Sequence, residues 1–176
     1  LIQKDLISKA RHMHRPVIVA TQMLESMIES SRPTRAEVGD VANAALLGTD
    51  AVMLSAETAV GKFPVGAVKM MDTVLREIEA HQWKHNEFDV NRVKHSDVNN
   101  LSIREAVSHA VTSLAQDLKL QGIIVPTRSG TTAKVLAANR PGAPLLGVSP
   151  SSNVCRILAL HWGVIPVVAK EKDTHN

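Results

Sequence analysis

A hydroxyl and an amide follow a short apolar run near the start of the chain. Val17 to Ala20 is typical of a buried parallel strand, and Thr21 and Gln22 come directly after it. Ligands of α/β folds bind beyond the carboxyl ends of parallel strands, so the Thr21 hydroxyl could donate to, or exchange a proton with, a small anionic substrate. The alternative is a strand-end hydroxyl that bonds a neighbouring backbone carbonyl.

A second run of the same kind occurs further along the chain. Ala51 to Ser55, AVMLS, ends in a hydroxyl, and Glu57 follows it. About 29 residues separate the two runs, which is enough for a parallel crossover that contains a helix. We therefore expect Thr21, Gln22, Ser55 and Glu57 to converge on one rim. The alternatives are that Ser55 caps a helix and that Glu57 offsets the dipole of that helix.

A third polar segment, TRSGTT, follows the apolar run GIIVP and precedes a predicted helix. Its glycine permits close backbone approach, and its hydroxyls and the amides of the first helical turn could surround a phosphate group. An ordinary capped helix is the alternative. The residues concerned are Thr127, Arg128, Ser129, Gly130, Thr131 and Thr132.

The histidines and the cysteine suggest no metal site. His81 and His85 have the i, i+4 spacing of a helical ligand pair, but no carboxylate completes the HExxH pattern. The single cysteine, Cys155, stands beside an apolar residue and is most simply a packed thiol. We expect no metal ligands in this segment.

Composition places the chain among ordinary globular proteins. Its 176 residues are 44% hydrophobic and 21% charged, with a formal net charge of +3. No apolar run approaches the roughly 20 residues of a membrane helix. Scattered cations and only four aromatic residues argue against a nucleic-acid surface. One cysteine agrees with a reducing cytosol.

The periodicity predicts alternating helices and strands. Thr34 with Glu37, and Ser102 with Glu105, have capping-box spacing, and Pro64 suits the first turn of a helix. The predicted apolar helix faces are Val65, Val68, Met71, Leu75 and Ile78 in one helix and Ile103, Val107, Ala110, Val111, Leu114 and Leu118 in another. Three later strands are predicted at 122–126, 145–149 and 164–169, and the polar segment 86–100 reads as a linker.

Two long runs carry a resemblance to a known family. VIVATQMLESM and SRPTRAEVGDVANAALLGTDAVMLSAETAVGKFP resemble pyruvate kinases, densely from Lys4 to about Trp83 and more loosely beyond. The resemblance implies an α/β chain that begins in mid-barrel. Residues 1–86 would be the last two strand-helix units of a (β/α)8 barrel, residues 87–100 a linker, and residues 101–176 most of a smaller three-layer α/β domain.

The resemblance also implies a function. Pyruvate kinases, cytoplasmic homotetramers of glycolysis, transfer a phosphoryl group from phosphoenolpyruvate to ADP and protonate the enolate to pyruvate. Thr21 and Ser55 would be catalytic, Thr21 and Gln22 would bind substrate, and residues 127–132 would bind a sugar-phosphate or AMP effector. Mg²⁺ and K⁺ ligands would lie outside this chain. Ala56 and Val60 stand where many members carry Gly and Lys. If that lysine helps to hold the nucleotide phosphates, Val60 does not supply the contact.

Two expectations concern the segment by itself, and two alternative functions stand beside them. Two strands cannot close a barrel of eight, so residues 1–86 should fold poorly alone and the 176-residue chain should lack kinase activity. The alternative function is a non-catalytic effector-binding or oligomerising module. A nucleic-acid binder rests only on the basic pI.

Overall fold

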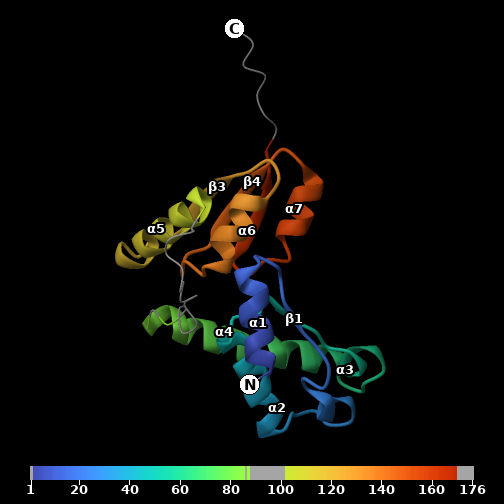
Figure 1. Ribbon diagram of the computed structural model, residues 1–176. Coiled ribbons are helices and arrows are strands. Elements are labelled where there is room, and N and C mark those ends of the chain that lie inside the picture. The colour runs from blue at the N-terminus through green and yellow to red at the C-terminus, as the bar shows by residue number, and fades with distance from the viewer. Residues whose placement is uncertain (1, 86, 88–101, 170–176) are drawn as a thin grey trace. The chain divides into compact units, whose positions relative to one another are not determined.

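The computed structural model describes residues 2–85, 87 and 102–169 (Figure 1). The chain divides into two compact units, residues 1–8 with 17–91 and residues 9–16 with 92–176. The predicted linker, apart from Glu87, lies outside the described residues. No helix among the described residues is long and apolar enough to cross a membrane.

The first unit contains two short parallel strands and the helices around them. β1 (Ile18–Val19) pairs with β2 (Ala51–Val52), with Ile18 opposite Ala51 and Val19 opposite Val52. The predicted parallel neighbours are therefore confirmed, although each strand is shorter than its apolar run. The remaining elements are the first part of α1 (Ile2–His12), whose residues after Ser8 belong to the second unit, the 3₁₀ helix η1 (Glu25–Ile28), α2 (Arg35–Leu46), α3 (Ala56–Ala59) and α4 (Pro64–His85).

The predicted helix starts of this unit are confirmed. Thr34 caps α2, since its side chain accepts a hydrogen bond from the Glu37 N–H and the Glu37 carboxylate accepts one from the Thr34 N–H. Pro64 is the first residue of α4. Both signals are local, because each depends on residues within one turn of the helix.

Met71 belongs to the apolar core of the first unit, as predicted for α4, but Val65 and Val68 do not. Val65 and Val68 remain exposed, and Ala67 is buried in their place. The core face of α4 is therefore rotated relative to the predicted one. The buried cluster consists of Met23, Leu24, Met27, Val41, Ala44, Ala67 and Met71.

Side chains fix the amino end of the parallel pair. The Asp50 carboxylate accepts a hydrogen bond from the Val17 N–H at 2.9 Å, and the Thr49 hydroxyl donates to the Val17 carbonyl at 2.9 Å. Thr49 is buried. These contacts set the register at the point where the two strands begin.

The second unit is a parallel three-stranded sheet in the order β3-β4-β5. Its elements are α5 (Ile103–Asp117), β3 (Ile123–Pro126), α6 (Thr131–Ala138), β4 (Leu145–Ser149), α7 (Ser152–Leu158) and β5 (Val164–Val168). All three predicted strands are thus present. The predicted capping box at Ser102 and Glu105 is also formed.

Helices α6 and α7 cover one face of this sheet (Figure 1). At the centre of β4, an added Cβ on Gly147 would lie 3.1 Å from Leu158 of α7 and 3.9 Å from Ala133 of α6. On the opposite face Ile124 and Ile165 are 70% and 53% exposed. The described residues therefore form two layers here, and the third layer stays a prediction.

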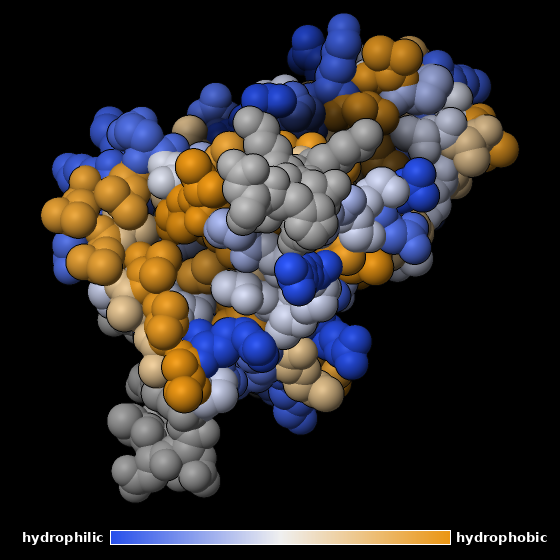
Figure 2. All heavy atoms as spheres, turned by 90° about the horizontal axis from the view of Figure 1, so that it is seen from above, coloured by the Kyte–Doolittle hydropathy of each residue, from blue (hydrophilic) through white to orange (hydrophobic). Residues whose placement is uncertain are grey.

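Val111 packs against the apolar core as predicted, but the rest of the predicted apolar face of α5 is wrong. Its buried residues are Ser108, Thr112 and Ala115, while Ile103, Val107, Leu114 and Leu118 are exposed. Small side chains let α5 approach α6 closely, and the Ser108 hydroxyl accepts a hydrogen bond from the Asn139 amide at 2.7 Å. Apolar side chains consequently remain on the molecular surface, as the orange areas of Figure 2 show.

Gly61 allows the turn after α3 to lie against η1. A Cβ at Gly61 would sit 2.5 Å from the Glu57 carbonyl oxygen and 3.2 Å from the Cα of Ile28, both backbone atoms that cannot move cheaply. Gly39, inside α2, has nothing within 4 Å of the same position. The two glycines are therefore a matched pair for substitution.

We predict that Gly61→Ala lowers the free energy of unfolding of the intact protein by about 1–3 kcal/mol through overpacking. Gly39→Ala should raise it by about 0.5–1 kcal/mol, because alanine favours a helix interior. Urea denaturation of each variant measures both effects. Shifts in the same direction for the two variants would contradict the packing.

Candidate active site

Thr21 and Gln22 form a strained turn after β1. Their φ angles are 72° and 55°, which puts two consecutive non-glycine residues in the left-handed region. Both residues are exposed. The Thr21 hydroxyl donates a hydrogen bond of 2.6 Å to the Ala20 carbonyl, the local bond of the alternative interpretation. A catalytic or substrate-binding role for either residue stays a prediction.

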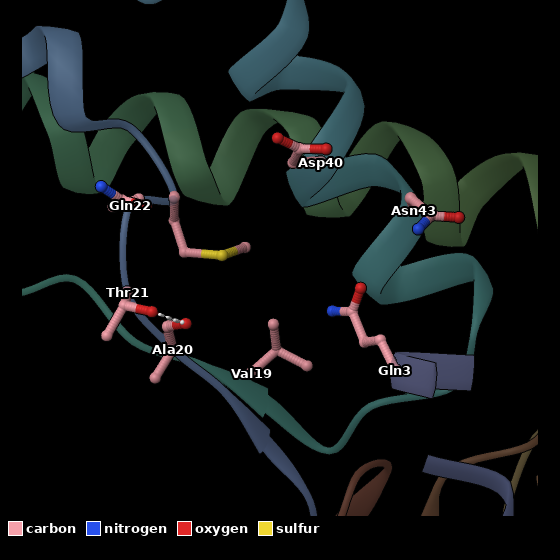
Figure 3. A pocket seen from close by; sticks show the side chains of 8 residues that line it. Gln3, Val19, Ala20, Thr21, Gln22, Asp40 and Asn43 are labelled. Atoms are coloured by element: carbon pink, nitrogen blue, oxygen red, sulfur yellow. Dashed lines mark hydrogen bonds between the residues drawn. The ribbon is translucent and has the colours of Figure 1, made fainter. Parts of the chain in front are cut away.

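The turn borders a pocket of about 270 Å³. Figure 3 shows Asp40 and Asn43 of α2 across the pocket from Thr21. These two residues are not among those predicted for the site, although a spacing of three positions places them on one helix face. The full lining is Gln3, Val19, Ala20, Thr21, Gln22, Met23, Asp40 and Asn43.

Ser55 does not line this pocket. It is exposed and occupies the N-cap position of α3, as the helix-cap alternative predicts, but its side chain makes no capping hydrogen bond. The structure thus places Thr21 and Ser55 after neighbouring strands without bringing them together in the pocket. The catalytic role of Ser55 stays a prediction.

Glu57 connects the two segments that follow the strands. One carboxylate oxygen accepts a hydrogen bond from the Leu24 N–H at 3.2 Å, and the other accepts one from the Ser55 N–H at 2.7 Å. Glu57 is 2% exposed. The predicted convergence of Glu57 with the ends of both strands therefore occurs through the backbone. The alternative, that Glu57 only offsets the dipole of α3, does not account for its bond to Leu24, which lies 33 residues away in sequence.

Glu37 holds the next part of the first segment. Its carboxylate accepts hydrogen bonds from the Ser26 N–H at 2.6 Å and the Ser26 hydroxyl at 2.5 Å. It also accepts from the Thr34 N–H at 2.7 Å and the Thr34 hydroxyl at 2.9 Å. One carboxylate thus completes the capping box of α2 and fixes η1.

The pKa values of both carboxyl groups lie below the ordinary 4.5. Burial by itself raises the pKa of Glu57, but N–H donors from Glu57, Ser55 and Leu24 outweigh it, while the charge of Glu37 opposes them. Burial likewise raises the pKa of Glu37, and the bonds from Ser26 and Thr34 outweigh it. The folded chain therefore favours the ionised form of each group.

The segment 127–132 has a defined geometry at the start of α6. Gly130 adopts φ 81°, and its N–H donates to the Thr127 hydroxyl at 3.0 Å. The hydroxyls of Ser129 and Thr131 lie 2.9 Å apart. This arrangement fits an ordinary helix start as well as a phosphate site, so effector binding by residues 127–132 stays a prediction.

The rings of His81 and His85 have centroids 4.2 Å apart and are tilted by 31°, and His85 Nδ1 lies 2.9 Å from the His81 carbonyl oxygen. Among the residues that the structure describes, no group of three or more His, Cys, Asp or Glu could hold a metal ion. Cys155 is buried, as a packed thiol would be.

The lowered pKa values predict a loss of stability in acid. A carboxyl group whose pKa is lower in the folded state contributes stability that is fully present above its unfolded pKa and disappears as pH falls through its folded pKa. The urea midpoint of the intact protein should therefore fall as pH decreases below about 4.5. Replacing both Glu37 and Glu57 by Gln should flatten this dependence.

Glu77→Gln is the control, because Glu77 is an exposed residue of α4. It should leave the acid slope unchanged. The assignment would be overturned if the double variant and the unsubstituted protein lost stability in parallel.

Comparison with known proteins agrees with the sequence resemblance. Residues 1–68 match the family described as pyruvate kinase, barrel domain, and residues 105–176 match pyruvate kinase, alpha/beta domain. Pyruvate kinase 2 of Synechocystis is 47% identical over 168 residues, which cover 96% of this chain and 27% of the relative. Pyruvate kinase of Geobacillus stearothermophilus is 45% identical over 174 residues, 99% of this chain and 29% of the relative.

A solved structure is similar as well. The crystal structure of a pyruvate kinase from Cryptosporidium parvum superposes with a TM-score of 0.82 at 40% identity, covering 95% of this chain and 33% of that one. The chain thus spans about a third or less of the length of these relatives. Similarity along nearly the whole chain, in sequence and in structure, shows that the chain belongs to the pyruvate kinase family.

Proposed function

We propose that the protein containing this segment is a pyruvate kinase that transfers a phosphoryl group from phosphoenolpyruvate to ADP and protonates the resulting enolate. The observation that carries the proposal is the similarity of this chain to both pyruvate kinase domains. The matched residues include those at the ends of β1 and β2 and those of the second unit. The parallel neighbours β1 and β2 support it, since their carboxyl ends lead to Thr21 and Ser55.

In this proposal Thr21 takes part in proton transfer to the enolate and, with Gln22, contacts the substrate. Its hydroxyl now donates to the Ala20 carbonyl, so a rotation about the Cα–Cβ bond would free the proton for substrate. Exposure of Thr21 and the neighbouring pocket support access for a small anion. Ser55 would assist from the neighbouring strand end.

The finer architecture belongs to the same proposal. Residues 1–86 would supply the last two strand-helix units of a (β/α)8 barrel, and residues 101–176 most of a three-layer α/β domain. Residues 87–100 would connect them. The intact enzyme would be a cytoplasmic homotetramer of glycolysis, as the family resemblance implies.

Mg²⁺ and K⁺ would assist phosphoryl transfer by neutralising charge on the phosphoryl oxygens. The described residues form no His, Cys, Asp or Glu cluster able to hold a metal ion, so they do not fit as its complete site. We therefore assign no step of the reaction to a metal held by this segment. The ligands would come from other parts of the barrel.

The segment 127–132 would bind the phosphate of a sugar-phosphate or AMP effector. Its support is the left-handed Gly130 at the start of α6 and the adjacent hydroxyls of Thr127, Ser129 and Thr131. A module that only binds effectors or assembles subunits remains the second candidate function.

A coupled assay that converts pyruvate to lactate tests the proposed activity. The intact protein should turn over phosphoenolpyruvate and ADP, whereas the 176-residue chain should give only background, because two strands cannot close the barrel. Turnover by the 176-residue chain would refute the expectation that part of the active site lies outside this chain. An inactive but folded intact protein would favour the effector-binding module.

Thr21→Val in the intact enzyme should lower kcat by about 100-fold or more, the usual contribution of a positioned proton-transfer group. The KM for phosphoenolpyruvate should change much less. Thr73→Val is the matched control, since the exposed Thr73 hydroxyl also donates to a backbone carbonyl, that of Lys69. An unchanged kcat in Thr21→Val would remove Thr21 from the reaction.

A further inference from the structure

We propose that Glu57 is a positioning residue of the pyruvate kinase reaction, which sets the places of Thr21 and Ser55 by holding the backbone that carries each of them. This inference rests on the proposed function. It assigns Glu57 no contact with substrate, and its effect on the reaction passes through the two hydroxyl residues.

The first support is the division of the carboxylate between two segments. One oxygen accepts from Leu24, three residues after Thr21, and the other accepts from Ser55 itself. Leu24 is fully buried in the apolar core, so its N–H has little freedom to choose another partner. Moving the Glu57 side chain would therefore displace both strand-end segments.

The second support is the strained turn between β1 and Leu24. Thr21 and Gln22 both have positive φ angles, a conformation that side-chain-bearing residues keep only when surrounding contacts enforce it. Glu57 fixes the chain directly after this turn, and Glu37 fixes Ser26 two residues further on. Without the Glu57 bond, the turn could relax and carry the Thr21 hydroxyl away from its place.

The third support is that the site suits a carboxylate better than an amide. The Leu24 and Ser55 N–H groups donate to different oxygens of Glu57, so the site needs two acceptor oxygens. A glutamine supplies one acceptor, and its NH₂ group would face one of the two N–H groups. The Gly61 turn packs against the Glu57 carbonyl, which limits movement of the Glu57 backbone as well.

Glu57→Gln in the intact enzyme tests the proposal. We expect kcat per folded active site to fall by about 10- to 100-fold, as small misplacement of reacting groups does, while the KM for phosphoenolpyruvate stays within about threefold. Circular dichroism at the assay temperature gives the folded fraction. The control Glu77→Gln, the same change on the exposed face of α4, should leave both constants unaltered.

A double-mutant cycle separates positioning from general destabilisation. If Glu57 acts through Thr21, adding Glu57→Gln to Thr21→Val should lower kcat far less than Glu57→Gln does alone. Equal losses in the two backgrounds would overturn the proposal. So would a Glu57→Gln enzyme whose kcat per folded site matched that of the unsubstituted protein.

Glu57→Asp covers the case in which Glu57→Gln does not fold. It keeps the charge and both oxygens but is shorter by one methylene, so it should show the same fall in kcat with little change in KM. An unaltered kcat in that variant would overturn the proposal. The activity of the unsubstituted enzyme distinguishes failure of the proposed function from failure of this inference. An inactive unsubstituted enzyme refutes the proposed function. An active unsubstituted enzyme with fully active Glu57 variants refutes this inference alone.

Discussion

The Glu57 carboxylate stays ionised in a buried position because backbone donors replace the water it has lost. Burial of an unpaired charge is costly, and hydrogen bonds to an ionised acceptor are among the stronger ones in proteins. Here the donors belong to Leu24 and Ser55, which follow different strands. The two hydrogen bonds that stabilise the Glu57 charge therefore also join the segments that follow β1 and β2. The positions of Thr21 and Ser55 depend on these bonds.

The parallel pair needs such side-chain bonds because its ladder is short. Only two residue pairs align between β1 and β2, so strand pairing by itself fixes little of the chain. Thr49 and Asp50 hold the amino end at Val17, and Glu57 holds the carboxyl end. Glu37 then fixes η1 to the start of α2. The side chains of these four residues thus position the turn that carries Thr21.

Features encoded by neighbouring residues could be predicted from the sequence. The capping boxes of α2 and α5, the start of α4 and the parallel pairing of the strands all depend on short spacings or on apolar runs. The face of α5 could not be predicted by hydrophobicity, because close packing on α6 selected Ser108 and Thr112 instead of larger apolar side chains.

In the candidate site too, local features could be predicted and features set by tertiary packing could not. Thr21 and Gln22 could be singled out because polar residues at a strand end are a local signal. The burial of Glu57 could not be foreseen, since its partner Leu24 lies 33 positions away and contributes only a backbone N–H. Asp40 was missed because its relation to the pocket depends on how α2 packs beside β1.

Hydrogen exchange of single backbone amides, followed by NMR in the intact protein, tests the central contact most directly. If Glu57 joins the strand ends, the Leu24 and Ser55 amides should exchange slowly, and both should become faster in Glu57→Gln. Rapid exchange of either amide in the unsubstituted protein, at the rate of an exposed loop, would contradict this account.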